Sequence, residues 1–180
     1  FTGYGKSARG YHLRFWYMVP AIYKEGWQLM SNLNIDDLLM EGTDYDLQIE
    51  TSNNLYLNSN LKVSKVNNIY KLQGNNYTDV ILHLDKKAAF RTYKTEDFDL
   101  ATDIPAKGIN DQLAVELLNR ELQFLKTYLG SYPHQKMFID KNTQEKNPIY
   151  GLNKLPDFLS PFSDVFEWDM TIFKALTLSL

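Results

Sequence analysis

The stretch "QLAVELLNRELQFLKTYLGSYP" (residues 112–133) contains the clearest structural signal in this chain. Leucine and alanine recur there at intervals of three and four residues, which is the spacing of one face of an α-helix. Asn110 or Asp111 can cap the start of this helix, and Gly130 supplies a C-terminal stop. The sequence therefore predicts an amphipathic helix over residues 112–129 that packs its apolar face against a core.

The residues before this helix predict β-strands. Short apolar runs alternate there with polar residues, and asparagine- and glycine-rich turns separate several of them. In "DYDLQIE" (residues 44–50) the apolar side chains fall on one face and the acids on the other, as in a half-buried strand. Short strands at such close spacing favour an antiparallel sheet or sandwich. The predicted strands cover residues 11–18, 44–50, 61–66, 68–72, 77–84 and 88–94.

The residues after the helix predict two strands and a second helix. Pro156 stops the second of these strands, because a residue without an N–H cannot continue a hydrogen-bonded ladder. The second helix is apolar and poor in charges, so we expect it to be buried. The expected ranges are 136–139 and 149–155 for the strands and 167–180 for the helix.

A domain boundary is expected at residue 105, because Pro105 and Gly108 interrupt the chain just before the first helix. We therefore predict an α+β fold, in which an antiparallel β-rich N-terminal module, residues 1–105, is followed by a mixed module, residues 106–180. The sequence does not begin with Met and stops within an apolar periodic run. We expect it to be part of a longer protein.

The composition argues against several classes of function. Lys and Arg number 19 against 22 Asp and Glu, a net charge of -3, so no general positive field would gather nucleic acid. Cysteine is absent, which excludes disulfides, thiolate nucleophiles and cysteine-based zinc sites in this chain. The chain has neither a glycine-rich phosphate loop nor a G-x-S-x-G motif. Nucleotide binding and serine hydrolysis therefore lose support.

The order of the predicted elements resembles that of the aminopeptidase N-like zinc metallopeptidases, the gluzincin aminopeptidases. In that family a β-domain is followed by a helix, a G-x-Y-P turn, a strand, a G-x-M-E-N or G-G-M-E-Y-P edge motif and a helix bearing H-E-x-x-H. Here residues 130–133 look like the turn, residues 151–156 look like the edge motif, and "FWYMVPAIYKEGWQ" (residues 15–28) is similar to a segment of the β-domain. The resemblance implies that residues 1–105 end an N-terminal β-domain and that residues 106–180 begin a thermolysin-like α/β domain.

The zinc ligands of that family are missing from this chain. The family's chemistry needs two histidines at i and i+4 on one helix face, and a glutamate that acts as general base on the metal-bound water. At the corresponding place stands "ALTLS" (residues 175–179). The three histidines, His12, His83 and His134, lie elsewhere, and no two of them have metal-ligand spacing. We therefore predict no catalytic residue, no metal ligand and no cofactor within this chain; zinc is implied only if the parent protein is active.

The resemblance implies a substrate-binding edge formed by Gly151, Leu152, Asn153 and Lys154. In the family a glutamate of this motif pairs with the free α-ammonium group of the substrate. Lys154 stands at that position, and a cation there repels an α-ammonium group. Two interpretations stay open: Lys154 accepts a peptide carboxylate or an acidic side chain, or it is a solvated lysine that protects an edge strand from aggregation.

Two further groups of residues have a functional and a structural interpretation. His83 fits a strand histidine with a satisfied ring nitrogen better than it fits a metal ligand. The aromatic residues 15–17 with Trp27 offer a platform for stacking on a sugar or peptide, but such clusters more often pack a core or a hairpin.

Three functions remain open from the sequence. The first is a non-catalytic, peptide-binding or scaffolding relative of the metallopeptidases. The second is an active zinc aminopeptidase whose H-E-x-x-H lies beyond residue 180. The third is an unrelated β-rich interaction domain. The expected partner is a peptide or protein and not a nucleic acid, and the resemblance alone implies an exported or membrane-attached parent protein.

Overall fold

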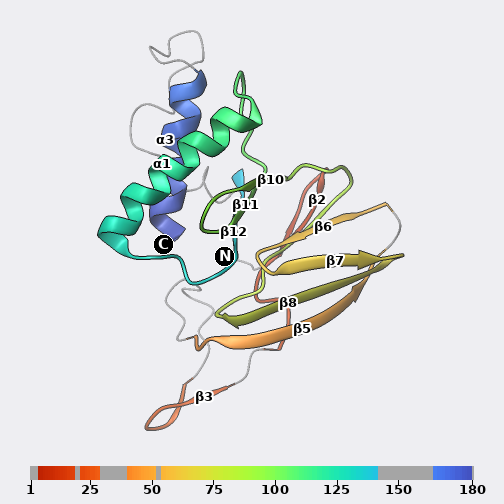
Figure 1. Cartoon of the computed structure of the whole chain (residues 1–180). Helices are drawn as coiled ribbons and strands as arrows, with labels where there is room; N and C mark the ends of the chain where they lie inside the picture. Colours follow the sequence, from red (N-terminus) through yellow and green to blue (C-terminus); the bar gives the residue numbers. More distant parts are fainter. Residues whose placement is uncertain (1–3, 19–20, 29–39, 52–53, 142–163, 180) are drawn as a thin grey trace. The chain divides into compact units, whose positions relative to one another are not determined.

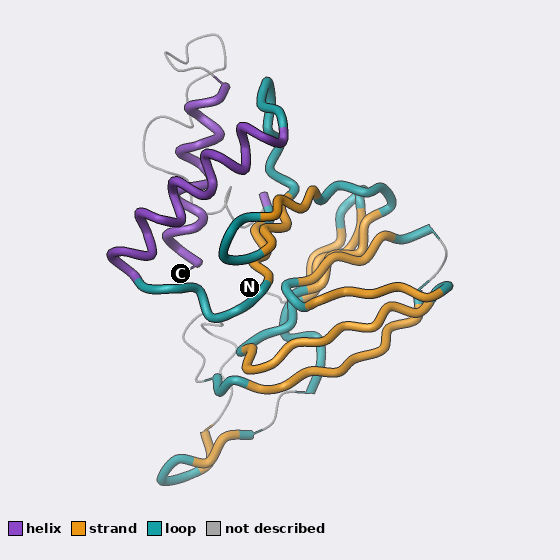
Figure 2. Tube along the Cα trace, in the orientation of Figure 1, coloured by secondary structure: helices purple, strands orange, loops and turns teal. Residues whose placement is uncertain are grey.

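The computed structural model shows a β-rich α+β fold (Figure 1). The chain divides between Ala89 and Phe90 into two compact units, here called unit 1 (residues 1–89) and unit 2 (residues 90–180). The described residues of unit 1 form strands and loops, whereas the helices α1 (Asp111–Leu129) and α3 (Asp164–Ser179) belong to unit 2 (Figure 2). The structure describes residues 4–18, 21–28, 40–51, 54–141 and 164–179.

The first sheet of unit 1 has four strands in the order β1-β2-β9-β6, and each neighbouring pair is antiparallel. Successive side chains of a strand point to opposite faces, so the pairing register assigns each residue to a face. One face is apolar and carries Leu13, Leu57, Leu82 and Leu84; the other is polar and carries His12, Asn58, His83 and Asp85. The strands are β1 (Tyr4–Lys6), β2 (Gly10–Leu13), β6 (Tyr56–Ser59) and β9 (Leu82–Asp85).

The second sheet of unit 1 has three antiparallel strands in the order β5-β8-β7. In β5 the side chain of Tyr45 is buried and those of Leu47 and Ile49 are partly buried, while the acids between them are exposed. This alternation confirms the half-buried strand that the sequence predicts there. The strands are β5 (Thr43–Glu50), β7 (Lys62–Val66) and β8 (Ile69–Tyr77).

The apolar faces of these two sheets share one core. Leu57 and Leu82 come from the first sheet and Tyr70 and Leu72 from the second, and all four are buried. Removing this apolar surface from water is the main favourable term that holds two sheets together. Unit 1 is thus an antiparallel sandwich, as the strand spacing predicts. A separate hairpin of two short strands, β3 (Ile22–Tyr23) and β4 (Trp27–Gln28), completes its described strands.

Unit 2 combines a three-stranded sheet with helix α1. The strand β10 (Arg91–Lys94) is antiparallel to β11 (Asp99–Thr102), which in turn is parallel to β12 (Lys136–Ile139). Parallel neighbours need a long crossover connection, and α1 supplies it between β11 and β12. Unit 2 therefore contains a β-α-β element.

The helix predicted over residues 112–129 is confirmed as α1. The Asn110 side chain caps it by accepting a 2.9 Å hydrogen bond from the backbone N–H of Leu113, and Gly130 follows it with a φ of 94° that favours glycine. The buried stripe of α1 consists of Ala114, Leu118, Leu122 and Leu125.

The second predicted helix is confirmed as α3, which begins three residues earlier than expected. It packs on the same core as α1 through Trp168, Ile172, Ala175 and Leu176. Arg120 of α1 also donates a 2.7 Å hydrogen bond to the Asp169 carboxylate of α3. Within the described residues, no helix has the length and apolar character needed to span a membrane.

The two units divide between Ala89 and Phe90, whereas the sequence predicts a boundary at residue 105. The difference arises because β10 and β11 belong to unit 2 through the pairing of β11 with β12. That pairing joins residues far apart in the chain, so local turn signals such as Pro105 do not reveal it.

Three of the predicted strands are too long at one end by three residues or more, and the one predicted over residues 88–94 begins only at Arg91. The strand predicted over residues 11–18 ends at Leu13, because Phe15 has a φ of 52°, which an extended ladder cannot contain. The strand predicted over residues 77–84 begins only at Leu82. Before it, the side chain of Asn60 holds residues 79–81 by donating to the carbonyl of Asp79 at 2.8 Å and accepting from the N–H of Ile81 at 2.9 Å.

Candidate functional site

In the part of α3 where the resemblance places the zinc ligands, Ala175 and Leu176 are buried, whereas Thr177 is exposed. Ala175 and Leu176 are both 0% exposed, and Ile172, one turn earlier, is 1% exposed. All three belong to the core that α1 and the sheet of unit 2 share. This face of α3 offers methyl groups, which can neither bind a metal ion nor move a proton.

The predicted substrate-binding residues Gly151, Leu152, Asn153 and Lys154 lie outside the described residues, as does the edge strand predicted over residues 149–155. Their roles stay predictions.

A surface hollow of about 570 Å³ runs along α1 in unit 2. Ion pairs and hydrogen bonds already engage much of its polar lining: Lys126 contacts the Asp97 carboxylate at 2.7 Å, and Asn119 accepts from the N–H of Glu96 at 3.1 Å. These contacts join α1 to the β10–β11 turn, and exposed ion pairs of this kind contribute only about 0 to 1 kcal/mol to stability. The lining consists of Glu96, Asp97, Asn119, Arg120, Leu122, Gln123 and Lys126.

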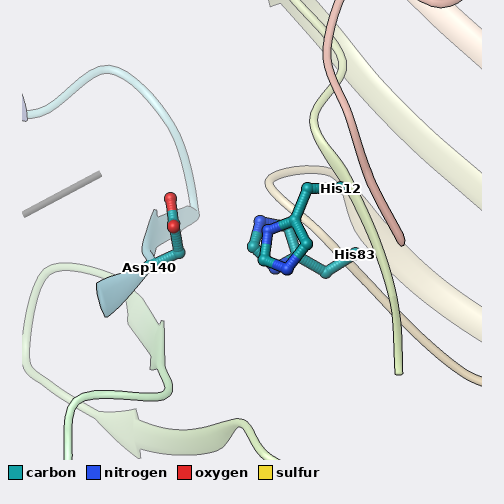
Figure 3. A group of neighbouring side chains, drawn as sticks. All are labelled: His12, His83 and Asp140. Carbon is teal, nitrogen blue, oxygen red and sulfur yellow. The ribbon is translucent and has the colours of Figure 1, made fainter. Parts of the chain in front are cut away.

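Among the described residues of unit 1, two histidines lie together on the polar face of the first sheet. His12 of β2 and His83 of β9 are directly opposite each other in the ladder, and their ring centroids are 3.9 Å apart at an interplanar angle of 60° (Figure 3). A ring nitrogen of His12 lies within 4.8 Å of a ring nitrogen of His83. His83 is 2% exposed, whereas His12 is partly exposed. Asp140, also drawn in Figure 3, belongs to unit 2, whereas both histidines belong to unit 1.

Neighbouring strands fix the backbone positions of the two histidines. His83 lies on a strand with a neighbour on each side, because β9 pairs with both β2 and β6. Asn58 of β6 is its partner in the ladder on the side away from His12, and Asp85 follows two residues later on the same face. A Cβ atom at Gly10 would clash with the carbonyl oxygen of Leu84 and lie 2.9 Å from the Cα of Asp85. Gly10 therefore permits the close approach of β2 to β9 beside the two imidazoles.

A partly buried ion pair follows β2. The Nε of Arg14 donates a 2.6 Å hydrogen bond to Oδ2 of Asp79, whose residue is 8% exposed. Burial raises the pKa of the Asp79 carboxyl above its ordinary value, and the hydrogen bond and charge of Arg14 oppose this effect. Burial also raises the pKa of the nearby Tyr17 phenol, and the hydrogen bond with Tyr45 acts in the same direction.

We expect the raised pKa of Asp79 to make the free energy of unfolding depend on pH. Between the ordinary pKa of a carboxyl, about 4, and the higher value in the folded state, the folded protein binds more protons, so stability falls as pH rises. Asp79→Asn should remove this contribution. Arg14→Ala should extend the fall to higher pH, because it removes the group that lowers the pKa of Asp79. Urea unfolding at a series of pH values measures both, and an Asp79→Asn variant with the same pH slope as the unmodified protein would contradict the expectation.

The aromatic residues singled out in the sequence have mainly structural roles. The indole N–H of Trp16 donates to the carbonyl of Val80 at 3.1 Å, and the hydroxyls of Tyr17 and Tyr45 are 2.9 Å apart. Both Trp16 and Tyr17 also pack against the core of unit 1. Trp27 instead is exposed in the β3–β4 hairpin, with its ring edge-on to that of Tyr23. The core interpretation therefore fits residues 16 and 17, and the hairpin interpretation fits Trp27.

The sequence alone does not predict that His12 and His83 lie side by side. Ligand motifs are found from short spacings along one helix or strand, whereas these two residues meet only because β2 pairs with β9. His134, the remaining histidine, follows α1 in unit 2, where its ring is edge-on to that of Tyr132 and burial lowers its pKa. A weak signal existed in the alternation of "YHL" and "LHL", which puts each histidine on the face opposite its leucine neighbours.

Comparison of this chain with known protein families, with curated proteins and with solved structures finds no match.

Proposed function

We propose that this chain is a non-catalytic relative of the aminopeptidase N-like metallopeptidases that binds peptides or serves as a scaffold. One observation carries the proposal: the face of α3 with Ile172, Ala175 and Leu176 is packed into a core. A zinc peptidase needs imidazoles and a carboxylate at such a helix face, exposed to a water-filled cleft. Here the same face contributes apolar side chains to the stability of unit 2.

The arrangement of elements in unit 2 supports the family part of the proposal. Helix α1, the strand β12 and helix α3 follow one another in the order that the resemblance implies for the start of a thermolysin-like α/β domain. A peptide added along a sheet edge gains main-chain hydrogen bonds, and side-chain pockets supply the specificity. The sequence motif at residues 151–156 is our candidate for such an edge, with Lys154 selecting a carboxylate.

The catalytic part of the proposal is tested by hydrolysis of amino-acid amides. The full-length protein, purified with and without added Zn²⁺, is expected to release no product above the buffer rate. Turnover that a chelator abolishes and Zn²⁺ restores would overturn the proposal in favour of an active enzyme with H-E-x-x-H beyond residue 180.

Peptide binding is tested with a panel of fluorescent peptides of different charge, followed by anisotropy. We expect acidic peptides to bind best and Lys154→Glu to weaken their binding by about tenfold, because a like charge at close range costs on the order of 1 to 4 kcal/mol. Lys107→Glu, which makes the same charge change at an exposed turn, serves as the matched control and should bind like the unmodified protein. Equal loss in both variants would show that only net charge matters.

A second candidate function is a β-rich interaction domain unrelated to the peptidases. The observation that favours it is the sandwich of unit 1, whose two antiparallel sheets share a core. Peptide or protein binding that Lys154→Glu leaves unchanged would favour this candidate over the first.

A further inference from the structure

We propose that His12 and His83 form a binding site for a divalent transition-metal ion of the Cu²⁺, Ni²⁺ and Zn²⁺ class. The site belongs to the first sheet of unit 1 and is independent of α3 and of the peptidase chemistry discussed above. It rests on the position of two imidazoles opposite each other on β2 and β9, with ring centroids 3.9 Å apart.

The distance between the rings suits a shared ion. Two imidazole nitrogens bound to one tetrahedral Zn²⁺ at about 2.0 to 2.1 Å lie roughly 3.3 Å apart. In the structure a nitrogen of His12 and a nitrogen of His83 lie within 4.8 Å of each other. Small rotations of the two side chains can close this difference, so the backbone need not move.

The strands hold the pair in place before an ion binds. Both β2 and β9 have a strand on each side, which restrains the Cα positions of His12 and His83. A ligand pair that is already positioned loses little conformational freedom on binding. The partial exposure of His12 gives an ion access from solvent, whereas His83 is buried.

The charge near the pair also favours a cation. Asp85 lies on the same face as His83, two residues along β9, which corresponds to about 7 Å between the Cα atoms. Its residue is 6% exposed, and attraction between a carboxylate and a dication is screened less at a buried position than in water.

The chemistry of the two donors selects the class of metal. Imidazole nitrogen suits Zn²⁺, Cu²⁺ and Ni²⁺, whereas Mg²⁺ and Ca²⁺ prefer oxygen ligands. Among the suitable ions Cu²⁺ forms the most stable complexes with nitrogen donors. We therefore expect Cu²⁺ to bind more tightly than Ni²⁺ or Zn²⁺, with water completing the coordination of each.

Calorimetric titration of the untagged full chain with each metal salt alone tests the proposal. One ion per chain is expected, in the order of affinity just given. His12→Ala and His83→Asn should each lower the affinity by about tenfold or more, since even loss of an outer-shell partner of a metal ligand costs 10- to 100-fold. His134→Ala removes the histidine of unit 2 as the matched control and should leave the affinity unchanged.

Electron paramagnetic resonance of the Cu²⁺ complex gives a second, independent measurement. Coupling to two imidazole nitrogens is expected for the unmodified chain and to one for His12→Ala. Circular dichroism checks folding, and if the buried His83→Asn variant does not fold, the partly exposed His12→Ala variant decides. Absence of binding to the unmodified chain, unchanged affinity in His12→Ala, or an equal loss in His134→Ala would each overturn the proposal.

Discussion

Replacing Leu176 with glutamate is expected to destabilise unit 2 by about 4 kcal/mol or more, because an unpaired carboxylate would stand in an apolar core. Leu176 is 0% exposed and packs with Ile172 and Ala175 among the residues that α1 and α3 share. The glutamate of an H-E-x-x-H motif would occupy this position in the alignment of "ALTLS" with the zinc helix. Writing the peptidase motif into α3 should therefore unfold the unit before it can create a metal site.

Urea unfolding followed by circular dichroism measures this effect. Met170→Glu introduces the same side chain on the same helix, at a residue that is 39% exposed, and should change the free energy of unfolding by less than about 1 kcal/mol. Should Leu176→Glu prove as stable as Met170→Glu, the end of α3 must be accessible to water, and the non-catalytic proposal would lose its main support.

Replacing Gly10 with alanine is expected to lower the free energy of unfolding by about 3 kcal/mol. This value is at the upper end of the usual range for overpacking a well-packed site. The added methyl group would meet backbone atoms, the carbonyl oxygen of Leu84 and the Cα of Asp85, which cannot rotate away as a side chain can. The strands β2 and β9 would have to separate beside His12 and His83. We therefore also expect weaker binding of Cu²⁺ to this variant.

Gly5→Ala is the matched control for Gly10→Ala. Gly5 lies on the neighbouring strand β1, opposite His12, and an added Cβ there would be 3.6 Å from the Cβ of His12, an ordinary contact. Thermal unfolding of the two variants should show a large decrease in the melting temperature for Gly10→Ala and little change for Gly5→Ala. Equal melting temperatures would mean that β2 and β9 are less closely packed than the structure indicates.

The parts of the fold that were predicted correctly are those with a local signal. Leucines at helical spacing between Asn110 and Gly130 predict helix α1. The alternation of Tyr45, Leu47 and Ile49 with polar residues predicts strand β5. Among the strands that were not predicted are β6 and β11. Both contribute short segments whose place depends on partners elsewhere in the chain, β9 for the first and β10 and β12 for the second.

The candidate sites divide in the same way. The lack of zinc ligands in "ALTLS" follows from residue identity alone, because neither alanine, leucine, threonine nor serine at those positions replaces an imidazole pair. That Leu176 lies in the core of unit 2 follows only from the packing of α3.

By itself, then, the sequence determined the α+β class, the two main helices, the half-buried strand β5 and the absence of H-E-x-x-H. Only the tertiary structure decided where the units divide, that β11 and β12 are parallel, and that His12 lies against His83. The physical reason is the range of the interactions. Helix periodicity and strand alternation are written into neighbouring residues, whereas strand pairing depends on the burial of a whole face and joins residues that no local pattern connects.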